Sequence, residues 1–115
     1  MSLRNSLYYV LECHEADYLI RFDSLHPIFA GHFPGHPIVP GACLIQIVEE
    51  LLSERLGQTA RFTAIRNLKF RQPVTPDMQV VIRIGDSKFE ITDTASTVVY
   101  AQFAATYLCT GSHVQ

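Results

Sequence analysis

Hydrophobic and polar positions alternate along two short segments near the start of the chain. Residues 6–12 and 18–22 are rich in β-forming side chains, and the polar residues 13–17 between them suit a turn. Strand-like patterns return over 61–70, 78–84, 89–91 and 97–108, with turns expected at 72–77 and 85–86. The pattern therefore predicts an antiparallel sheet of five or six strands.

A helical period replaces this alternation over 42–56. One broad face is apolar, and the opposite face carries a polar stripe. Gly57 is a typical helix end, and Pro40 lies near the first turn, where its missing N–H costs little. One helix against one antiparallel sheet predicts an α+β fold. The apolar face consists of Leu44, Ile47, Val48, Leu51 and Leu52, and the polar stripe of Gln46, Glu49, Glu50 and Ser53.

The length and composition bound the architecture. The chain has 115 residues, of which 48% are hydrophobic and 17% are charged, as in a folded globular protein. This predicts one domain over 1–110 and a flexible tail over 111–115. A core of this size leaves little room for a deep private pocket, so we expect a site between two copies.

Several functional classes are not expected from the composition. The formal net charge of −2 does not indicate a nucleic-acid binder. No apolar run approaches the ~20 residues that span a membrane, and residues 1–6 lack the features of a signal peptide. Three widely spaced cysteines without a CxxC pair suggest a reducing compartment. We therefore expect a cytoplasmic protein with neither a metal nor a redox cofactor.

The segment 26–41 is the most informative part of the sequence. It holds four of the six prolines and three of the six glycines, which predicts a constrained loop without a regular element. The loop leads into the helix, where backbone N–H groups carry partial positive charge and can polarise a carbonyl oxygen. A histidine held nearby can move a proton near neutral pH. This combination suits removal of a proton α to a carbonyl.

Two motifs resemble those of a known family. His32-Phe33-Pro34-Gly35-x-Pro37-x-x-Pro40-Gly41 resembles the active-site motif of the hotdog-fold 3-hydroxyacyl-acyl carrier protein dehydratases. Leu68-Lys69-Phe70-Arg71-Gln72-Pro73-Val74-x-Pro76 resembles the strand and turn that follow the helix in that family. The small accessory dehydratases of aryl-polyene-type pathways are the more similar members in size. The resemblance implies a hotdog fold, in which a curved antiparallel sheet wraps a long central helix.

The resemblance also implies partners and residue roles. The expected partner is acyl carrier protein bearing the acyl thioester, and the expected assembly is a homodimer with two interfacial sites, a higher oligomer, or a heterodimer with a related dehydratase. His32 matches the catalytic histidine, and Gly41 matches the glycine whose N–H binds the thioester carbonyl. Phe33 and Pro40 match substrate-binding positions. Gln46 occupies the position of a carboxylate that comes from the other subunit.

An amide at position 46 leaves three alternatives open. His32 could perform both proton transfers while Gln46 orients the hydroxyl. Glu50, one helical turn (about 5.4 Å) further along, or a partner's carboxylate could supply the acid. The chain could instead have lost dehydration and act as a partner subunit or another thioester enzyme. The family's pattern is an acid, three residues and then Gln, so the two polar groups look exchanged in this chain.

The sequence therefore predicts dehydration of a 3-hydroxyacyl thioester to a trans-2-enoyl thioester, in fatty-acid or polyene-type biosynthesis. A thioester hydrolase on the same fold and a non-catalytic or partner-dependent subunit are the alternatives. Residues 55–76 add a charge signal, because they contain five basic residues and no acidic ones. Such a stretch could steer an acidic carrier protein, or it could be an ordinary solvated strand.

Overall fold

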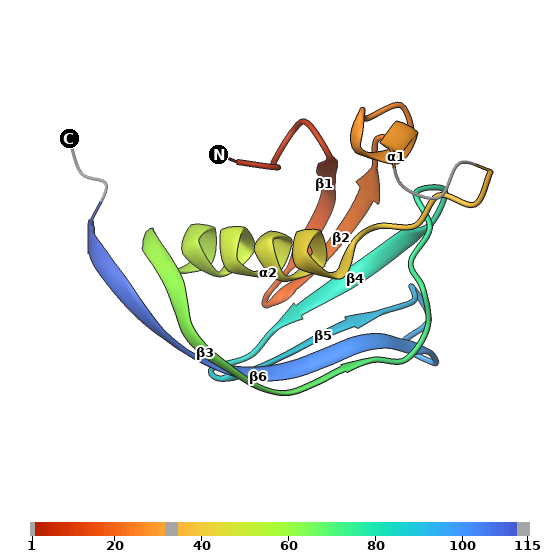
Figure 1. Cartoon of the computed structure of the whole chain (residues 1–115). Helices are drawn as coiled ribbons and strands as arrows, with labels where there is room; N and C mark the ends of the chain where they lie inside the picture. Colours follow the sequence, from red (N-terminus) through yellow and green to blue (C-terminus); the bar gives the residue numbers. More distant parts are fainter. Residues whose placement is uncertain (1, 32–34, 113–115) are drawn as a thin grey trace.

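The computed structural model describes residues 2–31 and 35–112. These residues form a six-stranded antiparallel sheet in the order β1-β2-β4-β5-β6-β3. Figure 1 shows the long helix α2 lying in the curve of this sheet, so the expected hotdog fold is confirmed. The strands are β1 (Tyr8–His14), β2 (Asp17–Phe22), β3 (Gln58–Phe70), β4 (Gln79–Ile84), β5 (Lys88–Thr92) and β6 (Val99–Ser112), and the helices are α1 (Ile28–Gly31) and α2 (Gly41–Leu56).

The apolar face of α2 packs into the core as the helical period predicts. Aliphatic side chains three and four residues apart share one side of a helix, and here that side faces the inner surface of the sheet. The aromatic rings of three residues pack against one another, with centroids 5.3–5.6 Å apart. They belong to Phe62, Phe89 and Phe103. The buried residues of α2 are Leu44, Ile47, Val48, Leu51 and Leu52, which are the five predicted positions.

Gly57 ends α2, also as predicted. Its φ of 68° lies in the left-handed region, which a residue without Cβ adopts readily. Its N–H donates to the carbonyl oxygens of Ser53 and Glu54, which would otherwise lack a helical partner. The chain then turns directly into β3, three residues earlier than the sequence pattern indicates.

Two further expectations need correction. The loop over 26–41 does contain a regular element, the single-turn helix α1, because the N–H groups of Phe29 and Ala30 donate to the carbonyls of His26 and Pro27, both at 3.1 Å. The Ile28 N–H also donates to His26 Nδ1 at 3.1 Å. Strand β6 continues to Ser112, which pairs with Gln58, so the regular structure extends two residues into the stretch expected to be a flexible tail. Backbone pairing with β3 accounts for this extension. No helix within the described ranges is long and apolar enough to cross a membrane.

Strand β3 lies at one edge of the sheet and is exposed over much of its length. Every residue from Thr63 to Phe70 is exposed, although this segment includes large apolar side chains. An edge strand offers unpaired backbone groups that another strand can complete. The exposed large hydrophobic residues of this segment are Ile65, Leu68 and Phe70.

Candidate active site

The first candidate group is the backbone of Gly41 at the start of α2. Pro40 precedes it, and the Pro40 carbonyl accepts hydrogen bonds from the N–H groups of Cys43 and Leu44 at 3.0 and 3.1 Å. The first N–H groups of a helix lack intrahelical acceptors, so they carry partial positive charge and can bind an oxygen. A Cβ added to Gly41 would lie 2.6 Å from Cζ of Phe70, so the ring leaves no room for a side chain there.

A hollow of about 320 Å³ opens beside this helix start. Its volume is within the range of small-molecule sites, and its walls are largely apolar. The hydrogen bond from Val39 N–H to the Val74 carbonyl, 2.7 Å long, joins two of its walls. A thioester carbonyl at Gly41 could therefore lie next to apolar surface. The lining residues are Ile38, Val39, Gly41, Leu44, Phe70, Arg71, Gln72, Pro73 and Val74.

His32 and Phe33, predicted as catalytic and substrate-binding residues, lie outside the described residues. Their roles remain predictions. On either side of them, α1 ends at Gly31 and the chain resumes at Gly35, six residues before α2. Pro40, the other predicted substrate-binding residue, immediately precedes Gly41 and is half-buried.

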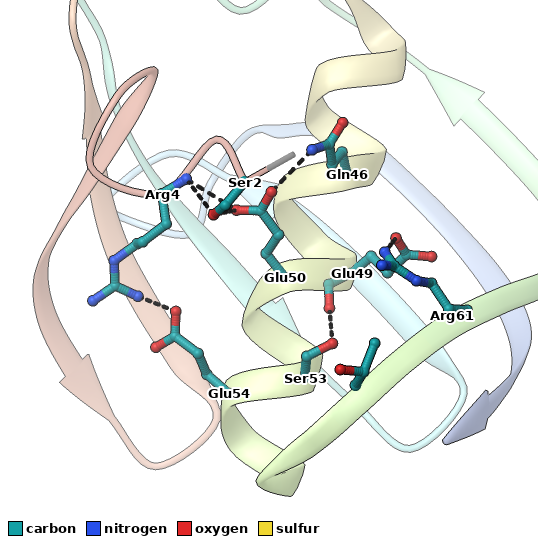
Figure 2. A pocket seen from close by; sticks show the side chains of 9 residues that line it. Ser2, Arg4, Gln46, Glu49, Glu50, Ser53, Glu54 and Arg61 are labelled. Atoms are coloured by element: carbon teal, nitrogen blue, oxygen red, sulfur yellow. Dashed lines mark hydrogen bonds and ion pairs between the residues drawn. The ribbon is translucent and has the colours of Figure 1, made fainter. Parts of the chain in front are cut away.

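Gln46 lies on the polar side of α2, where its side chain contacts Glu50. Gln46 Nε2 donates to Glu50 Oε2 at 3.0 Å, so the two groups that look exchanged in the sequence are directly bonded. Gln46 also lines two hollows, of about 420 and 370 Å³, on this side of the helix. Figure 2 shows its amide nitrogen directed toward Glu50 and its oxygen directed away.

The Glu50 carboxylate binds the N-terminal segment to α2. Both of its oxygens accept hydrogen bonds, and none of the donors except Gln46 comes from the helix. This environment differs from that of a free acid, because the carboxylate already accepts several hydrogen bonds from the chain itself. The donors are Ser2 Oγ (3.3 Å), Leu3 N (2.7 Å), Arg4 N (3.0 Å), Tyr8 OH (2.9 Å) and Gln46 Nε2 (3.0 Å).

Tyr8 shows the electrostatic effect of this arrangement. Its side chain is fully buried, and its hydroxyl donates to Glu50 Oε1. Burial, followed by the nearby negative charge of Glu50, raises the pKa of Tyr8 far above its ordinary value. The phenol therefore stays protonated and remains a donor. One turn along α2, Glu54 forms an ion pair with Arg4.

Glu49 and Ser53 bind a different segment, the start of β3. Glu49 Oε2 accepts from the Phe62 N–H at 2.8 Å, and Glu49 Oε1 pairs with Arg61 at 3.3 Å. The Ser53 hydroxyl donates to the Glu49 carbonyl at 2.9 Å and accepts from the Ala60 N–H at 2.9 Å. The polar stripe of α2 is therefore not only a solvated face, because it binds two backbone segments of the chain. The sequence shows no local signal for these partners.

The cysteines are free thiols, and none adjoins the Gly41 hollow. Cys13 and Cys109 are exposed, whereas Cys43 packs against the core in the first turn of α2. Burial raises the pKa of the Cys43 thiol, which opposes formation of a reactive thiolate. Within the described ranges, no cluster of three His, Cys, Asp or Glu side chains could hold a metal ion.

The basic stretch does not form one continuous patch. Arg55 donates to the Glu15 carbonyl at 2.8 Å, and Arg61 pairs with Glu49. Arg66, Lys69 and Arg71 lie on the exposed half of β3 and just beyond it, and none has an ion pair within residues 2–31 and 35–112. Arg71 lines the hollow beside Gly41, whereas Lys69 lines a separate hollow with Glu90 and Gln102.

The family assignment follows from a match over most of the chain. Residues 11–109 match the family described as "ApeI-like: ApeI dehydratase". The chain belongs to the ApeI-like dehydratase family. The matched range includes the loop, all of α2 and the edge strand, and thus every candidate group described above except the N-terminal residues that bind Glu50.

Individual relatives of this ApeI-like chain agree with the assignment. The 3-hydroxyacyl-acyl-carrier-protein dehydratase FabZ of Caulobacter vibrioides is 35% identical over 103 residues, covering 74% of this chain and 65% of the relative. The chain spans between 39% and 65% of the length of the curated dehydratases it matches.

Two solved structures share the fold. The dehydratase heterocomplex ApeI:P from Xenorhabdus doucetiae aligns with a TM-score of 0.66 and 24% identity, covering 90% of this chain and 94% of that one. A hypothetical thioesterase from Streptococcus pneumoniae, solved with coenzyme A, aligns with a TM-score of 0.58 and 12% identity over 96% of this chain and 94% of that one.

Proposed function

We propose that this chain catalyses the removal of water from a 3-hydroxyacyl thioester to give a trans-2-enoyl thioester. The observation that carries the proposal is the ApeI-like dehydratase match over residues 11–109. In the reaction, a base takes a proton from the α-carbon, and the bond between the β-carbon and its hydroxyl oxygen breaks. The departing oxygen takes a proton, either from the same base, which returns the one it removed, or from a carboxylic acid. The oxygen leaves as water, and a double bond forms between the two carbons.

Gly41 has the geometry to stabilise the charge that develops on the thioester oxygen. Loss of the α-proton moves negative charge onto that oxygen, and a preorganised N–H at a helix start lowers the energy of such a state. The adjoining hollow of about 320 Å³ supports the placement of the acyl thioester there. His32 is assigned the role of the base from its place in the motif.

The proposed substrate carrier is acyl carrier protein. Exposed Arg71 lines the Gly41 hollow, and it would attract an acidic carrier together with the exposed Arg66 and Lys69 of the preceding strand. The same charges would weaken this association at high ionic strength. We place the reaction in the cytoplasm, which agrees with three free cysteines.

The proposed assembly is a homodimer joined through β3. The exposed apolar residues of this edge strand and its unpaired backbone groups favour strand-to-strand pairing with another chain. A dimer would bring Gln46 of one chain toward the Gly41 hollow of the other, as the resemblance implies. Each site would then contain residues of both chains.

A second candidate function is that of a partner-dependent subunit. The amide of Gln46 stands where the related dehydratases have an acid, and an amide cannot donate a proton near pH 7. The Xenorhabdus structure is a heterocomplex of dehydratases, which supports a test with a related partner chain. In that case a second chain would supply the missing carboxylate.

The test is an assay of the purified chain with a 3-hydroxyacyl thioester on acyl carrier protein. Enoyl product supports dehydration, released free acid identifies a thioester hydrolase, and turnover only after a related dehydratase is added identifies a partner-dependent subunit. His32→Ala should reduce turnover at least ~100-fold, because general acid–base catalysis contributes that much. His36→Ala, an exposed histidine of the same loop, is the matched control and should retain activity. Full activity of His32→Ala would contradict the assignment.

A further inference from the structure

Both lysines of the chain line one hollow, although they belong to different strands. Lys69 lies in β3 and Lys88 lies in β5. The hollow that they share has a volume of about 280 Å³. Strand β6 runs between β3 and β5 (Figure 1), so the two lysines reach the hollow from opposite sides of β6. Only the folded sheet brings them together.

The hollow opens on the face of the sheet that points away from α2. Successive side chains of a strand point to opposite faces, and Phe89 and Phe103 belong to the core that α2 covers. Their neighbours Lys88 and Ala104 therefore point outward, where they lie opposite each other in the register of β5 and β6. This hollow is thus separate from the one that adjoins Gly41 at the start of α2.

A small side chain lies between long basic ones on this outer face. Ala104 pairs with Lys88 on one side and with Arg66 on the other. Lys69 pairs with Gln102, the next outward residue of β6. The methyl group of Ala104 leaves space that a longer side chain would fill. All of these residues except Arg66 line the hollow.

The positive charges of the two lysines are not matched inside the chain. Both side chains are exposed, and neither forms an ion pair among residues 2–31 and 35–112. Glu90 also lines the hollow, but its carboxylate is paired with Arg83 at 3.5 Å. Two like charges around one hollow repel each other, and an anion between them offsets that repulsion.

Gln102 adds a neutral donor to this group. Its Oε1 accepts a hydrogen bond from Arg71 Nε at 3.4 Å, so its Nε2 is left to donate. Ammonium and amide N–H groups are the donors that phosphate oxygens accept, and the charged ones form the stronger bonds. The hollow therefore combines two cationic donors and one neutral donor around a small residue.

We propose that this hollow binds the phosphate group of a small phosphate monoester, with Lys69, Lys88 and Gln102 as its donors. A monoester carries about two negative charges near neutral pH, which match the two ammonium groups. A phosphodiester carries one negative charge and leaves one lysine unmatched. The inference does not depend on the proposed dehydration, because the site lies on the opposite face of the sheet from α2.

A titration of the chain with methyl phosphate at constant ionic strength tests this site. Selective ¹³C labelling of lysine gives signals from only two residues, and the variants Lys69→Gln and Lys88→Gln assign them. The side-chain signals of both lysines should shift and saturate with one dissociation constant. Shifts that grow linearly without saturation, or a shift of one lysine alone, would overturn the proposal.

The two variants and a matched control measure how far the site depends on each lysine. Lys69→Gln and Lys88→Gln should each weaken binding about tenfold, because each removes one charged hydrogen bond. Arg21→Gln removes one positive charge from exposed β2, outside the hollow, and should bind within about twofold of the unchanged chain. An equal loss in all three folded variants would mean that net charge alone attracts phosphate, which would overturn the site.

Dimethyl phosphate tests the chemical class of the ligand. This diester carries one charge fewer than methyl phosphate and should bind at least about tenfold more weakly. Equal affinity for the two compounds would overturn the assignment of a monoester. None of these measurements involves turnover, so an inactive chain would contradict the proposed dehydration and leave this inference to its own test.

Discussion

On one side of α2, five buried aliphatic side chains lie against the inner surface of the sheet. On the other side, Glu49, Glu50 and Ser53 bind two separate backbone segments. The apolar contact is distributed over area and tolerates small changes of shape. The polar contacts depend on direction, because each donor needs one acceptor. The comparison indicates that the apolar side supplies most of the stability, while the polar side fixes where the N-terminal segment and β3 begin.

The largest expected effect comes from a cavity on the apolar side. Ile47 is fully buried, so Ile47→Ala should lower the free energy of unfolding by about 3 kcal/mol. Ile47→Val, which removes a single methylene, should cost only about 1 kcal/mol. Urea unfolding at neutral pH measures both. Equal losses in the two variants would contradict a contribution that scales with the volume removed.

A smaller loss is expected on the polar side, from Glu50→Ala. This change leaves the Leu3 and Arg4 N–H groups and the buried Tyr8 hydroxyl without their acceptor, and should cost about 2 kcal/mol. Glu54→Gln removes a partly exposed ion pair and should cost less than about 1 kcal/mol. Urea unfolding compares the two directly. Similar losses would mean that Glu50 is an ordinary surface carboxylate, and the distinction between the two sides would disappear.

The smallest effect is expected in the pH dependence of Tyr8. The folded pKa of Tyr8 is raised above the unfolded value of about 10, so its contribution to stability is fully present below pH 10. As the pH rises toward the folded pKa, the unfolded chain loses this proton first, and stability should fall by up to about 1.4 kcal/mol per pH unit. Tyr8→Phe should lack this component. Identical slopes between pH 9.5 and 11 in the two proteins would contradict the assignment.

The two sides of α2 also differ in how far the sequence predicts them. The apolar side follows from spacing alone, since residues three and four apart share a helix face, and all five predicted positions are buried. The partners of the polar side lie 46 to 48 residues away for Ser2, Leu3 and Arg4, and 13 residues away for the bond between Glu49 and Phe62. No periodic pattern encodes such pairings.

The loop before α2 was predicted only in part. Its prolines and glycines indicate a constrained loop, but they do not predict the single helical turn at Ile28–Gly31. That turn is held by local backbone hydrogen bonds to the His26 and Pro27 carbonyls and by the side-chain acceptor His26 Nδ1, which composition does not reveal. The motif placed Gly41 at the start of the helix, as found, because a proline followed by glycine at that point fits the first turn. The close approach of Phe70 to Gly41 needed tertiary structure.

The hydrogen bonds around Glu50 also constrain how this sequence can change. Gln46→Glu alone would place a second carboxylate within hydrogen-bond distance of Glu50, where two negative charges repel. Glu50→Gln alone would set an amide against the donors of Leu3, Arg4 and Tyr8. Each of these single substitutions, which would lead toward the arrangement of the related dehydratases, is therefore expected to lower the stability of the protein. The exchange of two side chains on one helix is thereby held in place by residues 42 to 48 positions earlier in the chain.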